Sequence, residues 1–231
     1  MTDSMAIVAI EQPNISHLVT EDDAPVDNLA SEKQMRLLTE SLYTGWSGPV
    51  DQRPFLAAAN VGLFASVHEP PIVPDVFLSL DVAVPDNWWE KGKRAYFFWE
   101  FGKAPDLVIE IVSNREGGEA DRKMAAYARM GIPYYVIYDP QQQVQEEMVR
   151  AYALTPRREY EEILPDHFVG LDLGLTLWSG VYENKEDTWL RWQDTTGQLI
   201  PTGAELAAQE RERADRLAAK LRQLGVDPNT V

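Results

Sequence analysis

The chain has 231 residues, a formal net charge of −16 and no cysteine. This length suits one domain with extensions, or at most two small domains, and a hydrophobic content of 45% excludes a wholly disordered chain. The lack of cysteine excludes a disulfide framework, a thiolate nucleophile and cysteine-ligated zinc. We expect a cytoplasmic protein without a membrane segment, because the first apolar run, residues 5–10, is too short for a signal peptide or a bilayer-spanning helix.

Acidic residues are unevenly spread along the chain. Residues 1–30 carry six acids and no base, whereas residues 91–140 have a net charge of +1. A protein that coats nucleic acid needs many Lys and Arg to displace counterions from the phosphates. The overall charge therefore disfavours that mode of binding, although the central segment is near neutral.

The periodicity predicts a mixed α/β domain after a loosely held acidic extension, residues 1–30. A helix is expected over residues 31–43, opened by Ser31 and Gln34 as a capping box, and a second helix over residues 119–130. Strands are expected, in chain order, over residues 55–67, 76–84, 94–101, 107–112 and 134–138.

The remainder of the chain reads as strands followed by one helix. Residues 148–154, 160–164 and 171–178 are β-like, and they either extend the same sheet or form a small separate one. Thr202 and Glu205 open a final helix whose apolar residues approximate heptad spacing. This helix could form a coiled coil, fold onto its own domain or stand in solvent. We therefore divide the chain into an extension (1–30), a core domain (31–200) and a C-terminal helix (201–231).

Glu110 is the most informative single residue. It interrupts residues 107–112, a run that is hydrophobic on both faces and therefore typical of a strand covered on both sides. An unpaired carboxylate buried there would cost several kcal/mol, so it needs a cation, a protonated state or a cleft. The alternative is a strand end that faces water.

Two further residues could join Glu110 in a site. Asp75 opens the neighbouring strand after Pro74, and two converging carboxylates are the oxygen ligands that Mg²⁺ or Mn²⁺ prefers. Lys123, in the next helix, could return over the strand end to orient an attacking water and stabilise developing charge. Each has a simpler reading, since Pro-Asp pairs commonly make turns and a helix lysine commonly extends into solvent.

Several short motifs around these residues resemble those of a known family. Over about residues 31–180 the sequence is similar to the Uma-two family. The motifs that carry the similarity are Pro74-Asp75, the run from Ala104 to Ser113, Asp121-Arg122-Lys123 with Tyr127, Gly131-Ile132-Pro133-Tyr134-Tyr135 and Asp139-Pro140. That family is grouped with the restriction-endonuclease-like, PD-(D/E)XK, superfamily. The resemblance implies a mixed sheet flanked by helices, here with a β extension and a C-terminal helix.

The resemblance also implies residue roles. Asp75 would be the first metal-binding aspartate, Glu110 the second acid, and the carbonyl of Ile111 a further metal ligand. The motif lysine is absent, because Val112 stands in its place, and Lys123 is the matching candidate in the next helix. Superfamily members sometimes use a glutamate of the first helix, for which Glu40 is the candidate and Glu32 a weaker one.

We thus expect a Mg²⁺- or Mn²⁺-dependent DNA endonuclease that hydrolyses phosphodiester bonds, with Asp75, Glu110 and Lys123 as catalytic residues. Its DNA affinity should be weak without the metal, and cutting both strands would favour a homodimer. A protein partner could bind the C-terminal helix. The alternative is a non-catalytic binding or regulatory protein on a nuclease scaffold. The three histidines are scattered without the spacing of metal ligands, and the sequence has no phosphate-binding glycine loop. Neither feature indicates a different chemistry.

Overall fold

The computed structural model describes residues 14, 28–49, 53–113, 119–224 and 227–228. The predicted extension, residues 1–30, therefore lies outside the described residues except at positions 14 and 28–30. The helical elements are α1 (Leu29–Gly45), the 3-10 turn η1 (Lys91–Lys93), α2 (Phe98–Phe101), α3 (Glu119–Met130) and α4 (Gly203–Gln223). The strands are β1 (Phe55–Ala59), β2 (Leu63–Phe64), β3 (Val76–Leu80), β4 (Tyr96–Phe97), β5 (Leu107–Ile111), β6 (Tyr134–Tyr138), β7 (Val149–Leu154), β8 (Tyr160–Ile163), β9 (Leu173–Tyr182) and β10 (Lys185–Asp194).

Six strands form the central mixed sheet, in the order β1-β3-β5-β6-β7-β8. The neighbours β5 and β6 run parallel, with α3 as their crossover, and the other neighbouring pairs run antiparallel. The predicted β extension is realised in both forms that the sequence left open. β7 and β8 extend the main sheet, whereas β9 and β10 form a separate two-stranded sheet.

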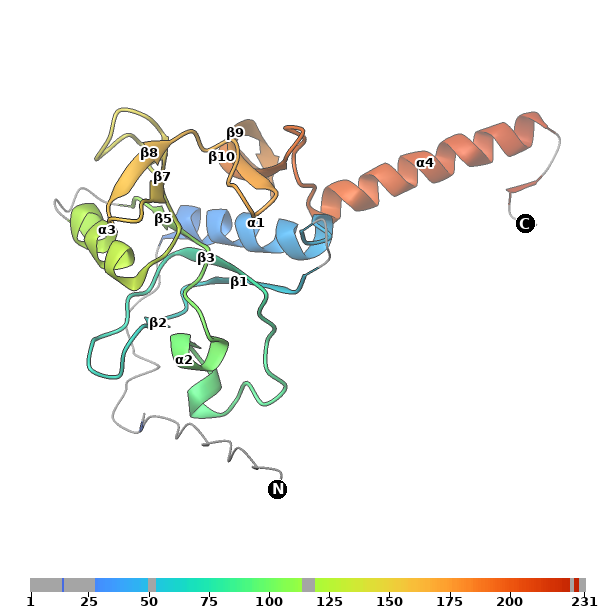
Figure 1. Cartoon of the computed structure of the whole chain (residues 1–231). Helices are drawn as coiled ribbons and strands as arrows, with labels where there is room; N and C mark the ends of the chain where they lie inside the picture. Colours follow the sequence, from blue (N-terminus) through green and yellow to red (C-terminus); the bar gives the residue numbers. More distant parts are fainter. Residues whose placement is uncertain (1–13, 15–27, 50–52, 114–118, 225–226, 229–231) are drawn as a thin grey trace, which may run out of the picture.

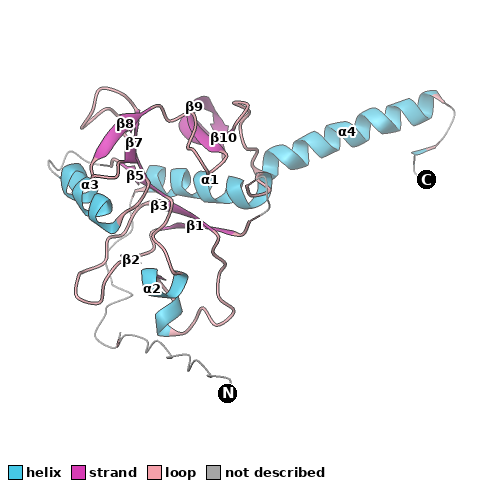
Figure 2. Ribbon diagram, in the orientation of Figure 1, coloured by secondary structure: helices cyan, strands magenta, loops and turns pink. Residues whose placement is uncertain are grey.

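Both faces of the sheet are covered, so that β5 is buried along its whole length. One face packs against α1 and the β9–β10 hairpin, through a core that includes Leu38, Ile109 and Trp192. The other face packs against α3 and the β4–α2 segment, through Val108 and Tyr127 among others. Figure 2 shows β1 and β3 between α1 and α2. The alternation along β5 therefore places Glu110 on the α3 side.

The first helix and strand β10 differ from what the sequence predicted. The first helix begins at Leu29 and is capped by Asn28, whose side chain accepts from the backbone N–H groups of Ala30 and Ser31. Gln34 makes no capping box there, because its buried amide instead bonds both the N–H and the carbonyl of Leu190 on β10. The strand β10 itself was missed, since its ends are charged and only residues 189–192 are buried.

The expected aromatic strand over residues 94–101 is also wrong beyond Phe97. The chain pairs only at Tyr96 and Phe97 and then turns into the short helix α2, which ends at Gly102 with a left-handed φ of 75°. This turn stacks the ring of Phe101 on that of Tyr96, with centroids 4.4 Å apart. The aromatic residues of this segment therefore pack against one another around a turn rather than along one strand.

The C-terminal helix α4 begins at the predicted capping box of Thr202 and Glu205. The guanidinium of Arg191 anchors this end by binding both carboxylate oxygens of Glu205, at 2.7 and 2.6 Å. Beyond its first turns the helix extends away from the rest of the molecule (Figure 1). None of its described residues is buried. Within the described part of the chain, no helix is both long enough and apolar enough to cross a membrane.

Candidate active site

The pairing of β3 with β5 brings the two predicted acids together. Val76 lies opposite Ile109 in this antiparallel pair, so the next position in register places Asp75 opposite Glu110. Residues opposite each other on neighbouring strands point to the same face of the sheet. Asp75 is 9% exposed and Glu110 is 8% exposed. The structure thus places the two acids side by side on one face of the sheet, and it buries Glu110 rather than leaving it at a strand end in water.

Two side chains of α3 hold the carboxylate of Glu110. Lys123 Nζ lies 2.7 Å from Oε2, and the hydroxyl of Tyr127 donates to Oε1 at 2.5 Å. Lys123 and Tyr127 are four residues apart and therefore share one face of the helix. The cation that a buried carboxylate requires is thus supplied by the lysine that the sequence singled out.

Asp75 is tied to the same strand by a backbone contact. Its Oδ2 accepts the N–H of Ile111 at 2.5 Å, so that the carboxylate is held against the end of β5. Ile111 therefore contacts the acid pair through its amide. The expected role of its carbonyl as a metal ligand stays a prediction.

Tyr127 is a site residue to which the sequence interpretation gave no role. Burial, followed by the negative charge of Glu110 and the hydrogen bond to it, raises the pKa of the Tyr127 phenol well above its ordinary value. The hydroxyl is therefore neutral and a hydrogen-bond donor at physiological pH. Its spacing of four residues from Lys123, on a helix that follows the acidic strand, was the available signal.

The donor set fits a hard divalent cation. Mg²⁺ is commonly bound through one or two carboxylates, with waters and substrate phosphates completing its octahedral shell. Asp75 and Glu110 supply such a pair of oxygen ligands. The described residues contain no group of three or more His, Asp or Glu side chains arranged to hold a metal. Two carboxylates nonetheless lie within the usual number for such a site.

The remaining candidates lie elsewhere. Glu40 accepts from the backbone N–H of Gly203 at 2.8 Å, so it fastens the start of α4 to α1. Glu32 pairs with Arg36 on the exposed side of α1. His68 and His167 are exposed, and His17 lies outside the described residues.

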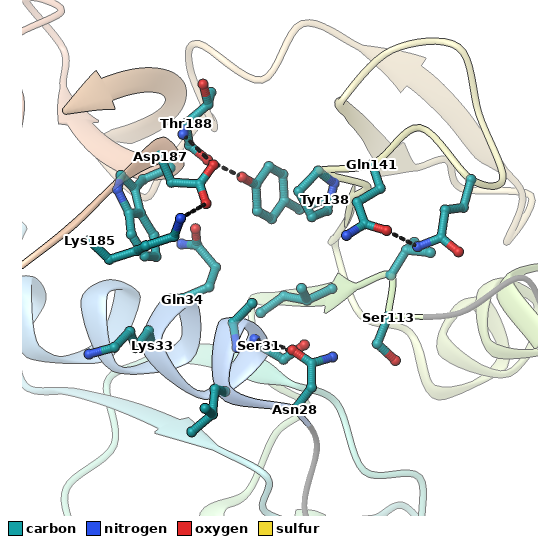
Figure 3. Close-up of a pocket in the computed structure, with 17 residues that line it drawn as sticks. Asn28, Ser31, Lys33, Gln34, Ser113, Tyr138, Gln141, Lys185, Asp187 and Thr188 are labelled. Carbon is teal, nitrogen blue, oxygen red and sulfur yellow. Dashed lines mark hydrogen bonds and ion pairs between the residues drawn. The ribbon is translucent and has the colours of Figure 1, made fainter. Parts of the chain in front are cut away.

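A separate pocket of about 350 Å³ opens on the opposite face of the sheet from Glu110. It lies between the start of α1, the ends of β5 and β6, and β10, and Figure 3 shows the hydroxyl of Tyr138 directed toward Thr188 across it. Lys185 and Asp187 pair at its rim. The catalytic candidates do not line this pocket, although Ile111 does.

The fold and the acid pair define the class of this protein. A mixed sheet with helices on both faces, and with paired acids at the end of a central strand, is the restriction-endonuclease-like architecture. A family model described as "Uma2: Putative restriction endonuclease" matches residues 23–177. The chain belongs to the Uma2 family, and this membership indicates a nuclease. A search of curated proteins found no match.

Proposed function

We propose that this protein is a Mg²⁺- or Mn²⁺-dependent DNA endonuclease whose site is formed by Asp75, Glu110 and Lys123. The observation that carries the proposal is the burial of Glu110 among partners from two elements. Its carboxylate is 8% exposed, faces Asp75 across the strand pair and receives both a lysine and a tyrosine from α3. Burying ionised groups costs several kcal/mol even when they are paired, so such a cluster is a poor device for stability alone.

Each residue has a distinct role in the proposed reaction. Asp75 and Glu110 would hold the divalent cation, which supplies a Lewis acid for the phosphodiester and lowers the pKa of the attacking water. Lys123 lies close enough to Glu110 to reach a water beside it, where its ammonium would orient that water and stabilise charge on the phosphoryl oxygens. Protonated lysine does so as a hydrogen-bond donor.

The charge of the chain supports a metal-assisted contact with DNA. The chain as a whole carries an excess of acids, which repel phosphates, whereas residues 91–140, which include Glu110 and Lys123, carry a net charge of +1. DNA binding should therefore be weak in chelator and should strengthen when a divalent cation neutralises the acid pair. A mobility-shift assay in chelator and in Ca²⁺ measures this difference.

The test of catalysis uses supercoiled plasmid and single-stranded DNA with Mg²⁺ or Mn²⁺. We expect cleavage by the wild type and none by Glu110→Gln, which keeps the shape and removes the charge. Asp106→Asn is the matched control, because Asp106 lies at the other end of β5 and accepts the N–H of Leu80, a bond that asparagine retains. Equal products from the wild type and Glu110→Gln would exclude the catalytic proposal and favour a non-catalytic nuclease scaffold.

The same assay tests whether the protein cuts DNA as a homodimer. A monomeric enzyme with one site should produce nicked circles before linear DNA, since each encounter addresses one strand. A twofold dimer should produce linear DNA directly. Sedimentation of the protein at the assay concentration then relates the cleavage pattern to the number of copies.

A further inference from the structure

Two side chains of α3 hydrogen-bond to Glu110, and they differ in how closely the rest of the molecule encloses them. The side chain of Lys123 is 26% exposed and ends in a flexible ammonium, whereas Tyr127 is 0% exposed. The ring of Tyr127 lies 5.4 Å from that of Tyr135 and packs in the buried cluster that includes Val108. A ring enclosed in this way cannot turn its hydroxyl away without disrupting the core. Lys123, in contrast, can extend into solvent.

The two partners also differ in how they would respond to a divalent cation. The Lys123 ammonium carries the same sign of charge as the cation, so the two repel each other at a shared carboxylate. The neutral Tyr127 hydroxyl supplies one proton to Oε1, and an ionised carboxylate still has several acceptor positions left. The tyrosine bond is therefore compatible with a metal ligand, whereas the lysine bond competes with it.

We propose that Tyr127 is a positioning residue, which holds the Glu110 carboxylate in place to receive a divalent cation while Lys123 is the exchangeable partner that the cation displaces. This inference rests on the proposed function, because it assigns a role in metal binding at the same site. Lys123, once released from Oε2, remains tethered on α3 beside the acid pair. From there its ammonium can act on the attacking water.

The chain contains a matched control for Tyr127. Tyr135 is also 0% exposed and belongs to the same buried cluster, but its hydroxyl has no hydrogen-bond partner among the described residues. Tyr127→Phe and Tyr135→Phe therefore remove the same atom from the same core. Only Tyr127→Phe removes a bond to Glu110.

The experiment measures Mn²⁺ binding to the full chain by titration calorimetry, for the wild type, Tyr127→Phe, Tyr135→Phe and Glu110→Gln. We expect Tyr127→Phe to bind Mn²⁺ about 10–100-fold more weakly, the usual effect of removing a partner that orients a metal ligand. Tyr135→Phe should bind as the wild type does, and Glu110→Gln should lose binding. Thermal melting of each variant without metal verifies that it is folded.

Cleavage assays give a second readout. In Tyr127→Phe the Mn²⁺ concentration for half-maximal cleavage should rise by the same factor as the dissociation constant. The rate at saturating Mn²⁺ should approach that of the wild type, because Asp75, Glu110 and Lys123 are all retained. A variant that had merely lost packing would not recover its rate with added metal.

Several outcomes would overturn the proposal. Wild-type Mn²⁺ affinity in Tyr127→Phe, with binding lost in Glu110→Gln, would remove the role of Tyr127 and leave the proposed function intact. Equal loss of affinity in Tyr135→Phe would assign the effect to core packing. A wild type that neither binds Mn²⁺ nor cuts DNA would remove the proposed function, and this inference with it.

Discussion

The contact between Asp75 and β5 allows a structural role to be separated from a catalytic one. Asp75→Ala leaves the buried N–H of Ile111 without its acceptor, which costs about 1–3 kcal/mol. In a domain of this size, 1 kcal/mol shifts the melting temperature by about 2–4 °C, so the alanine variant should melt about 2–12 °C lower. Asp75→Asn removes the same charge but keeps an oxygen to accept the bond. It should therefore melt close to the wild type.

Both Asp75 variants should lose Mn²⁺ binding and cleavage, since neither retains the carboxylate. The comparison requires differential scanning calorimetry in chelator, followed by cleavage assays with Mn²⁺. Asp106→Ala is the control, because it removes the acceptor of the Leu80 N–H at the opposite end of the same strand pair. It should lower the melting temperature without altering metal binding. Equal melting of the alanine and asparagine variants of Asp75 would refute the reasoning.

Three further predictions concern Lys123, Tyr96 and Gln34. Lys123→Met should reduce cleavage roughly 100-fold or more while Mn²⁺ binding is kept or strengthened, and wild-type cleavage rates would contradict its role. Burial raises the pKa of Tyr96 to about 12, so its contribution to the free energy of unfolding is present below about pH 10 and is lost as the pH rises through 12. Urea unfolding at a series of pH values from about 10 to 12 should therefore show a smaller decrease in the free energy of unfolding for Tyr96→Phe than for the wild type. Gln34→Leu unpairs the N–H and carbonyl of Leu190, which should cost about 1–3 kcal/mol for each group in urea unfolding, and unchanged stability would contradict that contact.

Elements with a strong local pattern were predictable from the sequence. Helix α3 and strand β6 have the predicted bounds, because their apolar periods and the flanking Gly131 and Pro133 act locally. The capping box at Thr202 was confirmed for the same reason. Strand β10 was not predictable in this way, since the burial of Trp189 and Trp192 depends on contacts with β9 and α1 rather than on alternation.

The candidate site shows the same division. Residue chemistry and family resemblance were enough to single out Asp75, Glu110 and Lys123 as candidates, because a carboxylate in a doubly covered strand requires compensation. Tyr127 was seen only as part of the motif. Its hydroxyl acquires a role only when α3 packs over β5 and places it 2.5 Å from Glu110. Glu40 was a candidate because it lies on the first helix, but in the folded chain its carboxylate accepts the N–H of Gly203 at the start of α4.

The sequence by itself indicated a mixed α/β domain and singled out Asp75, Glu110 and Lys123 as candidates for one site. Composition, period and motif spacing are properties of the chain, and they already restrict the class of fold. The tertiary structure decided which oxygen of Glu110 each partner holds, and it brought Asp75 onto the amide of Ile111 from 36 residues away. Those contacts depend on strand register and helix packing, which couple segments that no local pattern relates.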